Sequence, residues 1–372
     1  MEVIKVPYDP REVFRPFHNR TKRWAVLVCH RRAGKALDVD TPIPMADGSW
    51  KTMGDLQSGD QVLDENGKPC NILVAHDVLH NRNCYELTFS DGASIIADED
   101  HLWFTQTKLD RATTKRKTKG PRGAAVVVER TRQPKPGSVK TTKEILETLK
   151  YQGENNHSIP VAGPAQYPEL PLPIEPYILG LWLGDGHSRN SQFTTMDEQI
   201  KSALGAYAEQ NYFSLNEIQS SNAGKATTYS VCGDKYKSLT SKIRSLGLLL
   251  NKHIPEQYLR ASAAQRIELL RGFMDTDGSI SKDSQCEITQ KNFRLTTGIQ
   301  QLLWSLGVQC AIRKKHVNGS DYWRIGFRSA FNPFKLERKA NVWNHPHKTH
   351  AFSQKRYICK IEKVQSRPVR CI

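Results

Sequence analysis

Two patterns of hydrophobic and polar residues divide the chain. Between residues 36 and 105, short strand-like runs are separated by turns that contain glycine. These turns are Asp47-Gly48, Ser58-Gly59-Asp60, Asn66-Gly67 and Asp91-Gly92. Because Asp-Gly and Asn-Gly pairs favour tight hairpin turns, we expect a β-rich module built from hairpins. The expected strands include QVLDE (61–65), CNILVAHDVL (70–79) and CYELTFS (84–90).

The second pattern is an apolar helix that ends in an acid and a glycine, and it occurs twice. Its copies are ILGLWLGDG (178–186) and LRGFMDTDG (270–278). Their acids, Asp185 and Asp277, lie 277 − 185 = 92 residues apart. Each acid would sit at a helix C-terminus, where the helix dipole disfavours negative charge, and the two carboxylates would repel each other if they met. A divalent cation would relieve both penalties, because hard cations prefer carboxylate oxygen.

Small residues recur four positions apart in both copies, as Gly180 and Gly184 and then as Gly272 and Thr276. This spacing gives each helix a smooth face on which two helices can pack closely. Gly184 and Thr276 would lie beside the two acids, so we count them with the acids as expected metal-site residues. A glycine after an acid is also an ordinary helix stop, so only the pair of copies is specific.

The segments after the two copies follow one order of elements: helix, strand, strand and helix. Strands are expected at 191–195, 227–233 and 286–290, helices at 235–247 and 292–306, and a hairpin turn at Asn318-Gly319. Basic residues of these strands and turns are candidate phosphate contacts, although each alone could belong to a solvated surface. They are Arg189, Arg313, Lys314, Lys315, Arg324 and Arg328. The run NKHIP (251–255), which contains Lys252, lies between the two copies.

The twin motif resembles that of the LAGLIDADG homing endonucleases. The resemblance implies an α/β pseudo-dimer with an αββαββα repeat over residues 171–340, whose sheets sit on DNA. It also implies Mg²⁺-dependent hydrolysis of both strands of double-stranded DNA, with Asp185, Asp277 and Lys252 at the catalytic centre. We expect such a protein to be a monomer.

Composition favours a polyanionic partner. The chain has 54 Lys and Arg against 38 Asp and Glu, a net charge of +16, which points to nucleic acid. The net charge is about +6 over residues 1–35, about −10 over 36–105 and about +9 over 106–150. We expect residues 107–170 to be a basic linker or a DNA-contacting insertion. The eight scattered cysteines, with no signal peptide and no membrane-length apolar run, favour a reducing compartment such as the cytoplasm.

The first 35 residues end inside an incomplete phosphate-binding motif. WAVLVCHRRAGK (24–35) is typical of a strand that leads into a basic turn, with Lys35 placed to reach phosphate oxygens. The pattern then breaks, because Cys29 replaces its first glycine and Ala36 stands where a Ser or Thr should hold Mg²⁺. Residues 14–35 resemble the start of a phage terminase large subunit, which implies a DNA-packaging ATPase interrupted after Lys35.

The interrupting segment resembles an intein. Its similar blocks are residues 36–67, 91–105 and 356–372. The resemblance implies an all-β horseshoe of the Hedgehog/intein (HINT) type, made of residues 36–106 and an incomplete C-terminal part at 341–372, and interrupted by the endonuclease. Excision would rejoin Lys35 to a downstream Ser or Thr, so one insertion explains the broken motif.

The splicing chemistry that this resemblance implies must begin away from the first intein residue, because Ala36 has no nucleophilic atom. One intein class, similar to this sequence, uses an internal Cys coupled to a Trp two residues after a block histidine. Trp103 stands at that spacing from His101, and Cys371 falls on the internal-Cys position. Cys371 would attack the carbonyl of Lys35 and form a thioester. His101 would protonate the departing nitrogen.

Each of these residues also has a structural alternative. His101 could be a satisfied core histidine, Trp103 a core side chain and Cys371 an inert buried thiol. The Thr usually found three residues before the histidine is replaced by Asp98, which could serve as an acceptor instead. Only Ile372 follows Cys371, so the cyclising Asn and the Ser or Thr acceptor are absent, and we expect that this chain does not complete splicing.

Three functions are therefore distinguished. The first is an intein with a homing endonuclease that cuts an uninterrupted terminase gene. The second is a stand-alone DNA-binding or nuclease protein whose β module is structural and does not splice. The third is a packaging ATPase with a large insertion, which is disfavoured because no acidic strand motif for ATP-bound Mg²⁺ follows residue 36 in a suitable setting.

Overall fold

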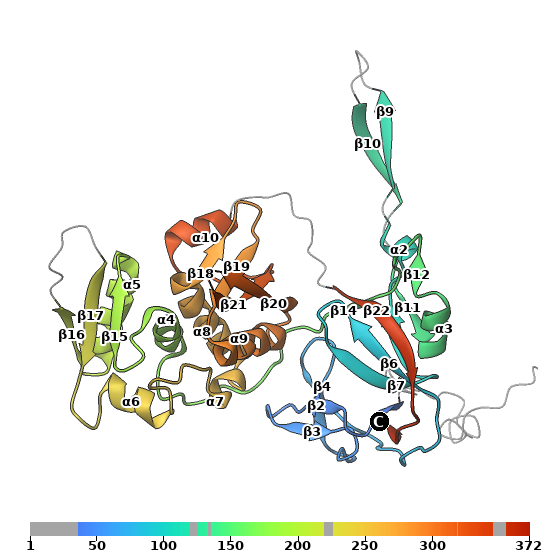
Figure 1. The fold of residues 1–372 in the computed structure, drawn as a ribbon, viewed down its shortest axis with the longest axis horizontal. Helices are drawn as coiled ribbons and strands as arrows, with labels where there is room; N and C mark the ends of the chain where they lie inside the picture. Colours follow the sequence, from blue (N-terminus) through green and yellow to red (C-terminus); the bar gives the residue numbers. More distant parts are fainter. Residues whose placement is uncertain are drawn as a thin grey trace, which may run out of the picture.

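The computed structural model describes residues 36–112, 114–119, 125–132, 135–218, 226–317, 319–344 and 355–372. They form two bodies that lie side by side (Figure 1). One body, the β module, is built from both ends of the described chain, and the other, the α/β domain, is built from its middle. The expected phosphate-binding motif, with Lys35, lies outside the described residues. None of the described helices is long and apolar enough to span a membrane.

A six-stranded sheet in the order β14-β22-β6-β7-β1-β23 organises the β module. Its strands are β1 (Ala36–Asp38), β6 (Cys84–Phe89), β7 (Ser94–Asp98), β14 (Ser158–Pro160), β22 (Lys355–Val364) and β23 (Val369–Cys371). All neighbours in the sheet are antiparallel. The first and the last described strands are therefore adjacent, which brings together the two ends of the expected all-β horseshoe.

Three of the four predicted turns join antiparallel hairpins. The pairs are β2 (Pro42–Pro44) with β3 (Trp50–Thr52), β4 (Gln61–Leu63) with β5 (Pro69–Asn71), and β6 with β7. The glycines of these turns have φ between 77° and 85°, a region that other residues rarely adopt. The strand expected at 70–79 ends at Asn71, because the following residues turn to bond β23 through His76 and Leu79.

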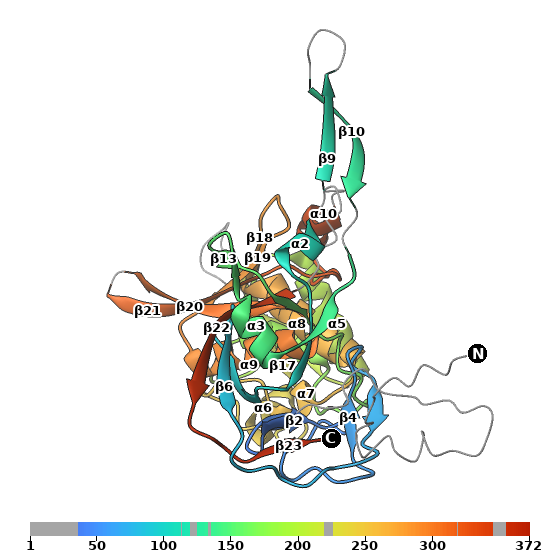
Figure 2. The same ribbon diagram turned by 90° about the vertical axis from the view of Figure 1, so that its right-hand side faces the viewer.

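Residues 107–170, the expected linker or insertion, contain regular structure that belongs to the β module. After β8 (Leu102–Thr105), the elements of this region are α2 (Lys108–Arg111), β9 (Thr114–Lys119), β10 (Ala125–Arg132), β11 (Ser138–Thr141), α3 (Thr142–Glu147), β12 (Lys150–Tyr151), β13 (Glu154–Asn155) and β14. β11 pairs with β8, and β14 pairs with β22. A capping box of Thr141 and Glu144 starts α3, whose Ile145 is buried in the core. Only the β9-β10 ribbon extends away from the body (Figures 1 and 2).

The α/β domain consists of two halves. The first contains α4 (Pro176–Asp185), β15 (Gln192–Thr195), α5 (Glu198–Gln210), β16 (Ser214–Ile218), β17 (Thr227–Cys232) and α6 (Leu239–Ser245). After α7 (Glu256–Leu259), the second contains α8 (Ala263–Thr276), β18 (Gly278–Ile280), β19 (Cys286–Gln290), α9 (Phe293–Ser305), β20 (Cys310–Val317), β21 (Ser320–Phe327) and α10 (Glu337–Asn344). The second half has the predicted αββαββα order. In the first half, a single bridge between Gly186 and Phe193 replaces the β18-β19 pair.

Helices α4 and α8 cross in backbone contact at the centre of the domain. A Cβ on Gly180 would lie 2.9 Å from Cα of Gly272, and a Cβ on Gly272 would lie 2.8 Å from the nitrogen of Leu181. Real Cβ atoms do not approach backbone so closely, so glycine is required on both helices. The predicted smooth helix face is therefore confirmed.

The segment between β14 and α4 is hydrogen-bonded to both bodies. On the side of the β module, the N–H of Gly163 donates to Glu65 O at 2.8 Å. On the other side, the N–H of Ala165 donates to Ser305 O at 2.9 Å. The fully buried guanidinium of Arg266 donates to the carbonyls of both Ala165 and Ser305. We call this hydrogen-bonded connection, from Gly163 to Ala165, the strap.

Candidate functional site

The two ends of the β module meet where the sequence places its reactive residues. In the pairing of β1 with β23, Ala36 lies directly opposite Cys371. Ala36 is buried and Cys371 is partly exposed. Lys35, whose carbonyl is the expected target, precedes the described residues. The structure thus brings Cys371 to the expected junction, and the reactivity of its thiol stays a prediction.

His101 lies at the same junction. Its Nδ1 is 3.1 Å from the carbonyl oxygen of Ala36, and only 3% of the residue is exposed. The ring of Trp103 lies against the imidazole, with centroids 4.4 Å apart and planes inclined by 50°. The indole N–H of Trp103 donates to the hydroxyl of Thr142 at 2.9 Å, and the N–H of Thr142 donates to the carbonyl of His101. Helix α3 therefore holds Trp103, and Trp103 limits the orientation of the imidazole.

Asp98 is the acceptor that the sequence suggests for the junction. Its carboxylate is 1% exposed and accepts from two guanidinium nitrogens of Arg82, at 2.5 and 3.2 Å. It also accepts from the N–H of Asp100 at 2.6 Å. These bonds come from Arg82 and from the loop itself, and the role of Asp98 as an acceptor at the junction stays a prediction. Asp98 also shapes the loop that carries His101.

Arg370 is a residue of this site that sequence reasoning missed. Its guanidinium donates to the carbonyls of His76, Gly54 and Leu56 at 2.6, 2.5 and 2.9 Å. The N–H of His76 in turn donates to the carbonyl of Cys371 at 3.0 Å. These bonds fix β23 beside β1. No motif marks Arg370, because all of its acceptors are backbone carbonyls of distant loops.

In the α/β domain, the predicted acids meet. Asp185 is the last residue of α4, and Asp277 directly follows α8. The helices are still in close contact here, since a Cβ on Gly184 would lie 2.8 Å from Cβ of Thr276. Partial burial and then the charge of Asp277 raise the pKa of Asp185 to about 6, and a hydrogen bond between the two carboxyl groups adds to this. Gln290 of β19 donates to Asp277.

This pair of carboxylates fits a hard divalent cation. Two like charges in a partly buried place favour protonation of one acid, as the raised pKa of Asp185 shows. A cation bound to both acids would keep both ionised and would replace their repulsion by attraction. The expected metal-site residues Gly184 and Thr276 lie at the same helix ends, where their carbonyl oxygens accept hydrogen bonds from lysine ammonium groups.

A lysine lies at each of the two helix ends. Lys252 Nζ donates to Gly184 O at 2.9 Å at the end of α4. Lys339 of α10 donates to Met274 O at 2.8 Å and to Gly278 O at 2.7 Å at the end of α8. Burial lowers the pKa of each lysine to about 8, against the attraction of nearby carboxylates. The sequence identified Lys252 but not Lys339, which the repeat itself could have suggested as the second member of a pair.

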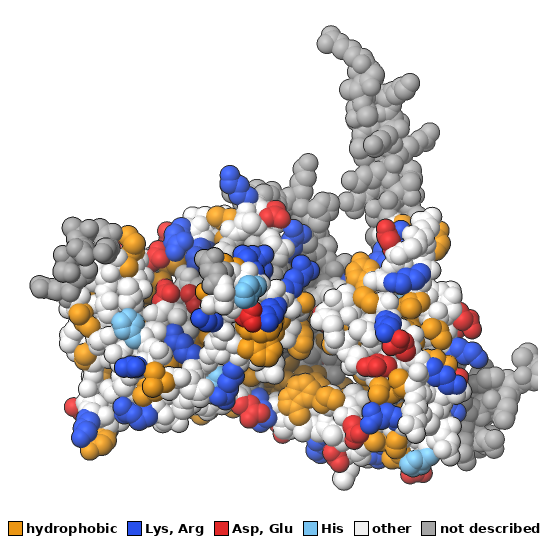
Figure 3. All heavy atoms as spheres, viewed as in Figure 1, with side chains coloured by type: hydrophobic (Ala, Val, Ile, Leu, Met, Phe, Trp, Pro, Cys, Tyr) orange, Lys and Arg blue, Asp and Glu red, His pale blue; other side chains and the backbone are white. Residues whose placement is uncertain are grey.

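The predicted phosphate contacts lie mainly on the second sheet of the α/β domain. Arg313, Lys314 and Lys315 are on β20, Arg324 is on β21, Arg328 directly follows β21, and Arg189 is in the turn after α4. Three of these residues form surface ion pairs, with Asp321, Glu287 and Asp283. Within the described ranges, Arg313 and Lys315 are in no ion pair. Lys and Arg side chains gather on this part of the surface (Figure 3).

Comparison with known proteins agrees with this architecture. Residues 264–336 match the model of the LAGLIDADG-like domain. The chain is 35% identical over 367 residues to the replicative DNA helicase DnaB of Mycobacterium intracellulare, covering 94% of this chain and 57% of that protein. It is 46% identical over 80 residues to DnaB of Mycobacterium leprae (strain TN), covering 22% of this chain and 13% of that protein. The chain therefore spans little more than half of the first relative.

Two solved structures are also similar to parts of the chain. The crystal structure of the MchDnaB-1 intein is 48% identical with a TM-score of 0.18, and the match covers 19% of this chain and 53% of that one. Mesophilic variants of the homing endonuclease I-DmoI are 16% identical with a TM-score of 0.34, and the match covers 46% of this chain and 97% of that one.

These relatives correct one expectation. The curated protein that matches nearly the whole chain is a replicative DNA helicase, so a phage terminase is not supported as the host of this element. The resemblance to a terminase rested on residues 14–35 alone, which lie outside the described residues. The described residues thus combine an all-β module of the HINT type with an α/β pseudo-dimer of the LAGLIDADG type, and residues 264–336 of that pseudo-dimer match the LAGLIDADG-like domain.

Proposed function

We propose that this chain is an intein that carries a homing endonuclease, and that its α/β domain hydrolyses both strands of double-stranded DNA. The observation that carries the proposal is the meeting of Asp185 and Asp277 at the ends of two helices in backbone contact. Each half of the domain contributes one acid, so the domain has one acid for each of the two DNA strands to be cut. The LAGLIDADG-like match over residues 264–336 supports this assignment.

The residues around the acids have distinct roles in this proposal. Asp185 and Asp277 would hold Mg²⁺, which supplies charge stabilisation at the attacking and leaving oxygens. Lys252 and Lys339 fix the two helix ends through backbone carbonyls and keep positive charge beside the acids. A preorganised ammonium stabilises the extra charge of the transition state at no cost in reorganisation.

The DNA partner is an uninterrupted copy of the gene that carries the element. The exposed cations of the second sheet would bind its phosphates without reading the bases. Arg313 and Lys315 are the best placed for this role, because neither is held in an ion pair within the described ranges.

Asp185→Asn and Asp277→Asn test the nuclease. On a plasmid library that contains the cleavage site, we expect each variant to lose cleavage in Mg²⁺ by roughly a hundredfold or more, since an amide binds the cation poorly. DNA binding, measured without turnover in Ca²⁺, should persist. Asp234→Asn makes the same charge change on an exposed loop after β17 and should cleave normally. Normal cleavage by both motif variants would refute the nuclease.

The β module is proposed to begin splicing at the bond between Lys35 and Ala36. The Cys371 thiolate attacks the Lys35 carbonyl carbon, the bond from that carbon to the Ala36 nitrogen breaks, and a thioester to Cys371 remains. The departing nitrogen takes its proton from His101. The pairing of Ala36 with Cys371 and the contact of His101 with Ala36 support this order of events. Reduced thiols suit a bacterial cytoplasm.

A further inference from the structure

The two copies of the helix motif differ at one buried position. Two residues before each acid, the first copy has Leu183 and the second has Asp275. Each residue is 1% exposed. A leucine at this place needs no explanation beyond packing. A carboxylate at the same depth needs partners, because an unpaired buried charge is strongly unfavourable.

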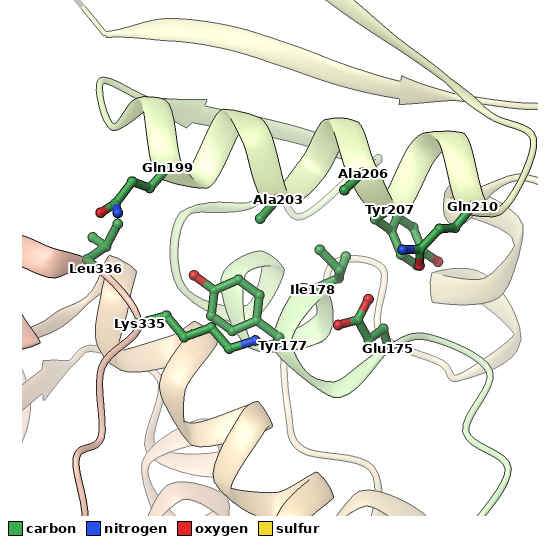
Figure 4. A pocket seen from close by; sticks show the side chains of 10 residues that line it. All are labelled: Glu175, Tyr177, Ile178, Gln199, Ala203, Ala206, Tyr207, Gln210, Lys335 and Leu336. Carbon is green, nitrogen blue, oxygen red and sulfur yellow. The ribbon is translucent and has the colours of Figure 1, made fainter.

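The partners of Asp275 come from two different elements. Its carboxylate accepts from the hydroxyl of Tyr177 on α4 at 2.8 Å. It also accepts from the backbone N–H groups of Lys335 and Leu336, at 3.1 Å each. Figure 4 shows Tyr177, Lys335 and Leu336 on one side of a cavity of about 360 Å³, with α5 on the other side. Asp275 therefore ties the first turn of α4 to the segment that enters α10.

This tie fixes the start of α10. The N–H groups of Lys339 and Ala340 donate to Leu336 O at 3.0 and 2.8 Å, so Leu336 begins the first turn. A negative charge at this end also suits the helix dipole. Lys339 lies one turn further on, and its ammonium returns to the carbonyl of Asp275 itself at 2.8 Å and to that of Gly278. The side chain of Asp275 thus binds the residues just before α10, and its backbone carbonyl binds Lys339 in the first turn of that helix.

We propose that Asp275 is a positioning residue for DNA cleavage, which holds α10 so that the ammonium of Lys339 is kept against the backbone carbonyls at the end of α8, close to the pair of acids. The inference rests on the proposed nuclease function. In the first half, Lys252 reaches its helix end from a loop that is held differently, by a bond from the Asn292 amide to Lys252 O at 2.8 Å. Asp275 therefore holds the lysine at the end of α8 directly, whereas the loop of Lys252 is held by Asn292.

Because the bonds of Asp275 hold the lysine of the second half directly, loss of Asp275 should slow the cleavage of one DNA strand more than the other. In single-turnover cleavage of a supercoiled plasmid, Asp275→Asn should accumulate nicked circles, with its second-strand step roughly tenfold slower or more. Its affinity for DNA in Ca²⁺ should stay within about twofold of the unsubstituted protein. Tyr177→Phe, which removes one bond and retains the ring, should show a weaker form of the same effect and serves if Asp275→Asn fails to fold.

A double-mutant cycle with Lys339→Met separates positioning from general damage. If Asp275 acts through Lys339, adding Asp275→Asn to Lys339→Met should leave the second-strand rate unchanged. Asp197→Asn is the matched control, since Asp197 pairs with Arg338 of α10 at the surface, and it should produce no nicked intermediate. Equal slowing of both strands, or additive effects in the cycle, would overturn the proposal. Cleavage that survives Asp185→Asn and Asp277→Asn would instead refute the nuclease itself.

Discussion

Ala36 and Cys371 are direct cross-strand neighbours at the edge of the β module. Side chains in such a pair have Cβ atoms about 4.5–5.5 Å apart, so the thiol of Cys371 lies next to the residue at which splicing would begin. Ala36 has no nucleophilic atom of its own. The pairing of the two strands places the thiol of Cys371 where it could supply one.

Cys371→Ala should abolish thiol-induced cleavage between Lys35 and Ala36. In the whole chain, excess dithiothreitol should release residues 1–35 by exchange with the thioester, and mass spectrometry would detect that fragment. Without Cys371 no thioester forms, because Ala36 supplies no nucleophile.

The control for this experiment is Cys359→Ala, which removes a partly exposed thiol of β22 away from the junction. It should cleave at the normal rate. Release of the fragment from the Cys371→Ala protein would show that the thiol of Cys371 is not the nucleophile.

The raised pKa of Asp185 predicts how stability depends on pH. The pKa is about 6 in the folded protein against an ordinary 3.8, so the folded state binds this proton more tightly than the unfolded chain does. The free energy of unfolding therefore falls as pH rises through this window, and Asp185 is destabilising above about pH 6. In EDTA, Asp185→Asn should raise Tm near neutral pH, and the gain should vanish toward about pH 4.

Thermal unfolding across this pH range is the measurement. Asp283→Asn is a suitable contrast, because hydrogen bonds with Ser281 first, and Arg328 after it, lower the pKa of Asp283. That variant should gain no stability near neutral pH. A gain for Asp185→Asn that is the same at every pH would contradict the assigned cause.

Gly180→Ala should destabilise the α/β domain. The new Cβ would lie 2.8 Å from the backbone nitrogen of Phe273 and 2.9 Å from Cα of Gly272, and neither can move without separating the helices. We expect a loss of about 1–3 kcal/mol in the free energy of unfolding, measured with denaturant. Gly205→Ala is the matched helical control, since its nearest neighbour would be Leu215 at 3.9 Å. It should be neutral or gain up to about 1 kcal/mol.

Arg313→Ala should weaken DNA binding in a salt-dependent way. If Arg313 neutralises one phosphate, its loss should reduce the slope of log affinity against log salt by about 1, equally for different sequences. Arg324→Ala should have a smaller effect, because Arg324 is paired with Glu287. Fluorescence anisotropy in Ca²⁺ would measure both, with Arg244→Ala on α6 as the control. An unchanged slope for Arg313→Ala would remove it from the interface.

Local chemistry explains which parts of the fold were predictable. The helix expected at 292–306 is observed as Phe293–Ser305, because Asn292 caps it with its side chain and Leu306 ends it. The twin acids were found because their spacing within a repeat is specific. The capping box of Thr141 and Glu144 can also be recognised in the sequence. It lies, however, in a basic segment whose composition favours a linker or an insertion.

Other features depend on tertiary contacts that the sequence does not display. Lys339 is distant in the chain from Asp277, and only the folding of α10 against α8 brings its ammonium to the helix end. Asp98 stands three residues before His101, where a Thr is usual, and its carboxylate accepts hydrogen bonds from Arg82, which lies before β6. Such partners cannot be assigned from spacing within one motif.

The strap from Gly163 to Ala165 has a mechanical consequence. Since it is bonded to a hairpin of one body and to the end of α9 in the other, the two bodies should tumble in solution as one particle with a single rotational correlation time. If the α/β domain binds DNA as proposed, the same strap carries the β module along with it and keeps that module close to the bound duplex.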